Sequence, residues 1–145
     1  MDTKLFTNVV RLESSVDWAK KILSNPQYLL KWVPEVTTVD KSDGTFMVKR
    51  NGNALNQTEL IHVEEDDSKV IYVSSGGKLE YRLEFSISAE DKKTVVQEDL
   101  YIPENVDTRI PVKLLAPIAE HAFSVNLDNL AVLIEKIANQ NDVIN

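Results

Sequence analysis

The 145-residue sequence has no cysteine, only two histidines and only four glycines, and each shortage excludes a class of site. Without cysteine there can be no disulfide, no thiolate metal ligand and no cysteine nucleophile. His62 and His121 are far apart and form no HExxH-like motif, so we predict no metal site and no cofactor. The glycines form neither a phosphate-binding loop nor the Gly-x-Ser-x-Gly elbow of serine hydrolases.

Excess basic charge and long hydrophobic runs are missing as well. The net charge is -7, so there is no general basic surface to attract nucleic acid or an anionic membrane. No apolar run approaches the roughly 20 residues of a membrane span. The first residues, MDTKLFTNVV, lack the charged and apolar regions of a signal peptide. We therefore expect no nucleic-acid partner, no stable membrane insertion and a cytoplasmic location.

The remaining composition is ordinary for a globular protein. Apolar residues make up 43% of the chain and charged residues 27%. The length suits one domain with one core, and we find no linker, repeat or low-complexity segment. We expect a single domain over residues 1–145, present as a monomer or a homodimer.

The first third of the chain predicts a strand followed by two short helices. Residues 3–12 mix β-branched and apolar side chains, as strands do. Ser14 and Ser15 are candidate N-caps for the first helix, and Asn25 is the candidate cap of the second. Pro34 ends this second helix.

From residue 36 to residue 102 the hydrophobic period changes to two. Turn residues such as Asp43-Gly44, Gly76-Gly77 and Asp91-Lys92 separate the segments. Such short connections indicate hairpins, and hence an antiparallel meander. The six expected strands are 36–41, 45–50, 54–63, 69–75, 78–88 and 93–102.

The C-terminal part predicts one long amphipathic helix. Pro117 requires the regular helix either to begin near residues 114–116 or to be kinked there, and it leaves Asp107–Lys113 as an irregular flap. A projection at 100° per residue places Asn126 near the centre of the apolar stripe. The other members of this stripe are Leu115, Ala119, Ala122, Leu130, Leu133 and Ile137.

Asn126 and the small residues before it suggest a cavity. Ala119 and Ala122 make the first half of the stripe less bulky than the second, which leaves room beneath a curved sheet. A buried amide must find a partner. For Asn126 this partner is either the protein itself or a trapped water, or else a ligand in the cavity; the sequence supports both equally.

Strand alternation places a few polar side chains on the apolar face. Glu59 shares the parity of Ile61, but the sequence favours the alternative in which a register break or an edge position leaves it in water. One acid of the pair Glu98–Asp99 faces inward, where desolvation would raise its pKa. Glu59 and Glu98 are thus the weak catalytic candidates, and pairing with a neighbouring cation is the more common role for such acids.

Three aromatic side chains also fall on the apolar face or beside it. Tyr81 and Tyr72 each offer apolar area and one hydroxyl that could orient a ligand. Trp32 lies in the second short helix. For all three, ordinary packing in the core is at least as common as a role in a ligand site.

Three stretches resemble the START-like (SRPBCC) superfamily, the helix-grip fold. NPQYLLKWVPEV is similar to its second short helix with a Trp-x-Pro entry into the next strand, here Trp32 and Pro34. KKTVVQEDLYI is similar to its hairpin into the last strand, and NLDNLAVLIEKIA to its C-terminal helix. The resemblance implies an α+β fold in which a curved seven-stranded antiparallel sheet wraps around a long C-terminal helix, with two short helices after the first strand.

The same resemblance implies a cavity between the sheet and the last helix that binds a small hydrophobic or amphipathic molecule, such as a lipid-, polyketide- or quinone-like compound. One alternative is a cyclase- or hydrolase-type enzyme; the sequence favours a binding protein over it. A second alternative is a protein-interaction adaptor with an exposed apolar patch near Tyr28–Val33. The expected ligand-binding residues are Asn126, Tyr81, Tyr72, Glu59, Ala122, Ala119, Leu115 and Trp32.

Overall fold

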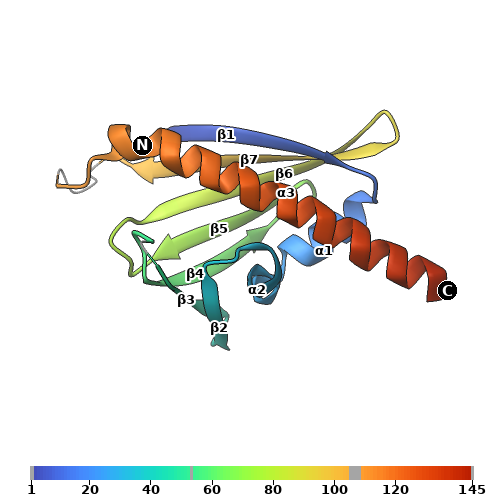
Figure 1. Cartoon of the computed structure of the whole chain (residues 1–145), viewed down its shortest axis with the longest axis horizontal. Helices are drawn as coiled ribbons and strands as arrows, with labels where there is room; N and C mark the ends of the chain where they lie inside the picture. The colour runs from blue at the N-terminus through green and yellow to red at the C-terminus, as the bar shows by residue number, and fades with distance from the viewer. Residues whose placement is uncertain (1, 53, 105–108, 145) are drawn as a thin grey trace.

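A computed structural model of the chain describes residues 2–52, 54–104 and 109–144, which form one curved sheet crossed by one long helix (Figure 1). The strands are β1 (Asp2–Leu12), β2 (Val36–Ser42), β3 (Thr45–Arg50), β4 (Thr58–Glu65), β5 (Lys69–Ser75), β6 (Tyr81–Glu90) and β7 (Lys93–Pro103). The helical segments are α1 (Val16–Leu23), the 3₁₀ turn η1 (Pro26–Tyr28), α2 (Leu29–Trp32) and α3 (Val112–Ile144).

The sheet is an antiparallel meander that β1 closes from the far side. Its strand order is β1-β7-β6-β5-β4-β3-β2, so β2 to β7 follow in sequence and β1 pairs with β7. Asp43 and Gly44 connect β2 to β3, and Asp91 and Lys92 connect β6 to β7, all with positive φ. Two such residues form the tight turn whose twist matches a hairpin. These turns confirm the predicted meander and the fold class.

Local capping explains where the short helices begin. Ser15 caps α1 by accepting a hydrogen bond from the Trp18 backbone N–H at 3.1 Å, so Ser15 rather than Ser14 fills this position. Asn25 accepts from the Gln27 N–H at 3.1 Å and begins η1, as predicted. The Tyr72 hydroxyl donates to the Leu23 carbonyl and thereby ties the end of α1 to β5.

The inner face of α3 covers the concave face of the sheet. Phe123 packs edge-to-face on Phe6 of β1, with ring centroids 5.3 Å apart. Beneath the short helices, Phe85 meets both Trp32 and Tyr72 in the same edge-to-face manner. The buried residues of α3 are Leu127, Leu130, Ala131, Ile134 and Ala138.

This burial pattern corrects the predicted stripe. The buried side of α3 is centred on Leu127 and Ile134, whereas Ala122 is exposed and Asn126 lies at the margin, half-buried. The error arose because α3 is apolar on both sides. Its outer face carries a second row of exposed hydrophobic residues, so the helical projection alone could not identify the inner face. This outer row comprises Leu114, Ile118, Val125 and Val132.

The start of α3 also differs from the prediction. The helix begins at Val112 and continues through Pro117. The last two residues of the predicted flap, Asp107–Lys113, therefore belong to α3, and its first two lie outside the described residues. In the part of the chain that the structure describes, no helix combines the length and apolar character needed to cross a membrane.

The short helices do not provide the exposed apolar patch predicted for an adaptor. Within Tyr28–Val33, Leu30 is exposed, but Leu29, Trp32 and Val33 are buried in the core. The side chains that would have formed the patch instead seal the space between α2 and the sheet.

We predict that the grip of α3 on the sheet dominates stability. Leu130 is fully buried, so Leu130→Ala should lower the free energy of unfolding by about 2–5 kcal/mol in urea titrations. The control is Val132→Ala on the outer face, where the side chain is 64% exposed and the change should stay within about 0.5 kcal/mol. Equal losses in the two variants would contradict this packing.

Candidate functional site

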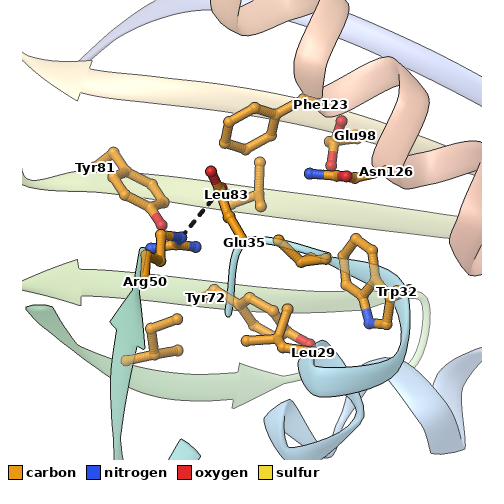
Figure 2. A pocket seen from close by; sticks show the side chains of 12 residues that line it. Leu29, Trp32, Glu35, Arg50, Tyr72, Tyr81, Leu83, Glu98, Phe123 and Asn126 are labelled. Atoms are coloured by element: carbon orange, nitrogen blue, oxygen red, sulfur yellow. Dashed lines mark ion pairs between the residues drawn. The ribbon is translucent and has the colours of Figure 1, made fainter. Parts of the chain in front are cut away.

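A small cavity lies between α3, the α2 segment and the concave face of the sheet (Figure 2). Its volume is about 30 Å³, which is room for about two water molecules. This is far less than the hollow predicted from the alanines of α3. The apolar part of its wall comes from Leu29, Val33, Ile61, Leu83 and Phe123.

Half of the predicted ligand-binding residues meet at this cavity. Asn126, Tyr81, Tyr72 and Trp32 all line it, although they come from four different elements. The other predicted residues of α3 are not part of its wall: Leu115 and Ala119 are half-buried nearer the helix start, and Ala122 is exposed. The Tyr72 hydroxyl is occupied by the Leu23 carbonyl, and burial raises its pKa far above the usual range, so it stays protonated.

Glu59 is buried, contrary to the favoured prediction that it lies in water, and its carboxylate is the centre of a polar cluster. It is 1% exposed and accepts hydrogen bonds from Arg50, Ser74, Asn56 at 3.2 Å and Tyr81 at 3.1 Å. Strand register explains the cluster. The C-terminal ends of β3 and β5 lie beside the N-terminal ends of β4 and β6, and the groups that surround Glu59 gather there. A carboxylate so completely matched is a structural anchor, and it has little capacity left for a reaction.

Asn56 locks the loop before β4 to the turn before β6. Its amide donates to the Leu79 carbonyl at 2.8 Å and accepts from the Leu79 N–H at 2.9 Å. Gly77 makes room for this contact, because a Cβ there would lie only 2.6 Å from the Asn56 side chain. The predicted register break near Asn56 is absent: β4 begins at Thr58 rather than at residue 54, pairs with β3 without a shift, and keeps Glu59 on the inner face.

Arg50 connects the Glu59 cluster to the cavity. Its Nη1 pairs with Glu59, and its Nε lies 3.3 Å from Oε1 of Glu35, which belongs to the turn between α2 and β2. Figure 2 shows Glu35 extending over the cavity toward Arg50. Neither residue was among those predicted from the sequence. Arg50 lies two residues after the buried Val48, so strand alternation could have placed it on the inner face. The position of Glu35 depends on how the turn between α2 and β2 folds, which no local pattern shows.

Glu98 forms a second and very different polar site, beneath Asn126. It is 1% exposed, and its only hydrogen-bond donor in the described chain is the Asn8 amide, 3.3 Å from Oε1. Burial raises the pKa of Glu98 to about 8; the Asn8 hydrogen bond lowers it in part, and the nearby charge of Asp99 raises it further. Near neutral pH this carboxyl group is therefore largely protonated and can donate a hydrogen bond.

Asp99 is buried too, but it does not line the cavity, so one acid of the pair faces inward, as predicted. It faces the other side of the sheet, where Thr7 and Gln97 donate to it and Lys4 lies 3.7 Å away. Burial alone would raise the pKa of Asp99, but these partners lower it overall. Asp99 is a satisfied surface-side acid and plays no part in the cavity.

Two buried polar atoms, in residues that line the cavity, have no partner among the described residues. They are Nε1 of Trp32 and Oε2 of Glu98. An unsatisfied buried donor or acceptor costs about 1–3 kcal/mol, so each of these atoms favours a polar partner close to it. No group of three acidic or histidine side chains in the described ranges is arranged to hold a metal ion.

No protein-family model and no curated protein sequence matches the chain. Solved structures do resemble it. A START superfamily protein from Mycobacterium smegmatis superposes with a TM-score of 0.74 at 15% identity, over 91% of this chain and 97% of the other. The di-domain ARO/CYC protein StfQ of the steffimycin biosynthetic pathway gives 0.71 at 14% identity, over 92% of this chain and 52% of that protein. A conserved protein from Geobacillus kaustophilus gives 0.65 at 16% identity, over 90% and 94%. The chain therefore has the START-like helix-grip fold that the sequence predicted.

Proposed function

We propose that this protein binds a small hydrophobic or amphipathic molecule between α3 and the concave face of the sheet. The observation that carries the proposal is the lining of the cavity, in which apolar side chains surround a few polar groups, among them Glu98, whose Oε2 has no partner among the described residues. Apolar surface would supply the affinity, and the few polar groups would orient the ligand. The START-like fold supports the same conclusion by analogy.

The small volume of the cavity means that the site must widen when the ligand enters. The residues able to move are those on its open side, because Phe123, Asn126 and Glu35 are only half-buried. The strand residues Ile61 and Leu83 are held in the sheet and form the fixed floor. A lipid-, polyketide- or quinone-like molecule would thus displace α3 and the α2–β2 turn, rather than the sheet. The cytoplasmic location remains a prediction.

The proposal is tested by blocking the cavity from α3. Asn126→Trp should fill the space and lower the affinity for the neutral dye Nile red at least tenfold, measured by fluorescence titration. Val125→Trp is the matched control: it adds the same side chain one residue away on the exposed outer face and should leave the affinity unchanged. Equal binding by both variants and the wild type, with unchanged thermal unfolding, would place the dye elsewhere and contradict the proposal.

A second candidate function is a cyclase- or hydrolase-type enzyme, and the observation that favours it is Glu98. A buried carboxyl group with a pKa of about 8 holds a proton at neutral pH and can deliver it to a ligand oxygen. Glu59 does not support this role, because four donors already surround it.

The enzyme hypothesis predicts slow hydrolysis of p-nitrophenyl butyrate that depends on Glu98. Glu98→Gln should then lower kcat about 100-fold without a comparable change in KM, because it removes the transferable proton. The Asn126→Trp variant, in which the cavity is blocked, gives the background rate. If the wild type hydrolyses the ester no faster than this variant, the cavity does not catalyse the reaction.

The buried acid also predicts how stability depends on pH. The pKa of Glu98 is about 8 in the folded protein against an ordinary value of 4.5, so between these values the folded state keeps a proton that the unfolded chain has lost. The contribution of Glu98 to stability is therefore fully present below about pH 4.5 and is lost as pH rises through 8. For one proton the slope reaches about 1.4 kcal/mol per pH unit.

Glu98→Gln removes this titration and keeps the shape of the side chain. Relative to the wild type, the variant should gain stability from pH 5 to pH 8 and level off above pH 8, measured by urea unfolding at each pH from 5 to 9. Glu64→Gln on the exposed side of β4 is the control and should follow the wild-type profile. Parallel profiles for Glu98→Gln and the wild type would show that Glu98 is ionised throughout.

A further inference from the structure

The guanidinium group of Arg50 holds two carboxylates in very different surroundings. Glu59 is fully enclosed and pairs with Nη1, deep between the strands. Glu35 lies 3.3 Å from Nε with 42% of its side chain exposed, and comes from a turn rather than a strand. The first pair belongs to the framework of the sheet. The second lies at the open side of the cavity, where one partner can exchange with water.

We infer that the Nε side of Arg50 is the recognition point for the carboxylate of an apolar monocarboxylic acid, and that Glu35 occupies this position until such a ligand enters. This inference rests on the proposed function and specifies its ligand class. The Glu35 carboxylate reaches over the cavity, as Figure 2 shows, so it takes the place that a ligand headgroup would take.

The exchange leaves the charge of the site unchanged. Removing any charge partner from a buried arginine is costly, but a ligand carboxylate replaces the Glu35 carboxylate one for one. Glu35 then returns to water, which costs little because it is already partly hydrated. An alcohol or ester cannot make this exchange, since it would leave Arg50 with one charged partner fewer. An arginine side chain also matches the planar geometry of a carboxylate.

The cavity walls define the rest of the ligand. From Arg50 the space continues past Leu83 and Phe123 toward Trp32, all of which line it. An apolar tail or ring would lie along these side chains, and its headgroup would remain at the Glu35 side.

The first experiment compares decanoic acid with 1-decanol, which have the same tail, by isothermal titration calorimetry at pH 8. Decanoate should bind the wild type at least tenfold more tightly. In ¹⁵N NMR spectra the Arg50 Nε–H signal should shift on addition of decanoate and stay in place with decanol. The Asn126→Trp variant should bind neither compound.

The second experiment removes the competing carboxylate. Glu35→Gln should tighten decanoate binding by about three- to tenfold, because the ligand no longer displaces a charged group, and should leave decanol binding unchanged. Glu64→Gln is the control, since it makes the same charge change on an exposed strand position and should alter neither affinity.

The results separate the inference from the function on which it rests. If decanol and decanoate bind equally, and Glu35→Gln changes neither, the cavity binds apolar molecules but Arg50 does not recognise their headgroup. If Glu35→Gln weakens decanoate binding, Glu35 supports the site instead of competing for it, and the inference is wrong. If neither compound binds and Nile red does not bind either, the proposed function itself fails.

Discussion

Burial of one face of α3 against the concave side of the sheet is the interaction on which the rest of the structure depends. A seven-stranded antiparallel sheet with an apolar face needs a cover, and α3 together with the short helices provides it. Leu127, Leu130 and Ile134 form the tightly packed half of this contact. The other half, toward the start of α3, packs less closely, and the cavity is found there beside Phe123 and Asn126.

The looser half of the contact is also where the sheet carries its inward polar groups. Two buried acids there avoid an unpaired charge in two different ways. At the ends of β3 to β6, a cation and three neutral donors match Glu59 completely. Removing the cation would leave a buried charge alone, which typically costs about 3–5 kcal/mol. On β7, Glu98 has one long hydrogen bond and retains its proton instead. The first group therefore holds the framework together, and the second keeps unused hydrogen-bonding capacity.

The sequence predicted the strands, the hairpins and the fold because these depend on local alternation and turn chemistry, which Asp43-Gly44 illustrates. It failed where two faces of one element are alike. The outer side of α3 also carries a row of apolar residues, with Val125 and Val132 among them, so the projection assigned Ala122 to the wrong side. It also failed where burial depends on a partner distant in sequence. The alternation within β4 places Glu59 on the inner face, but it does not show that Arg50 and Ser74 meet this carboxylate across the strands and make its burial possible.

The arrangement of charge and hydrogen-bonding capacity gives the cavity a direction. Arg50 with its exchangeable partner Glu35 lies at one side, and the protonated Glu98 beneath Asn126 lies at another, with Leu83 and Phe123 between them. Arg50 is already paired with the enclosed carboxylate of Glu59, and an apolar tail cannot replace that charge. Only the side of Arg50 that faces Glu35 is therefore available to a ligand. At the other side, a neutral acid can donate to a carbonyl or hydroxyl oxygen without adding charge. A ligand with an anionic end and a neutral polar group further along its chain would therefore satisfy both Arg50 and Glu98. The reversed orientation would place the anion against Glu98, a carboxyl group that can itself ionise.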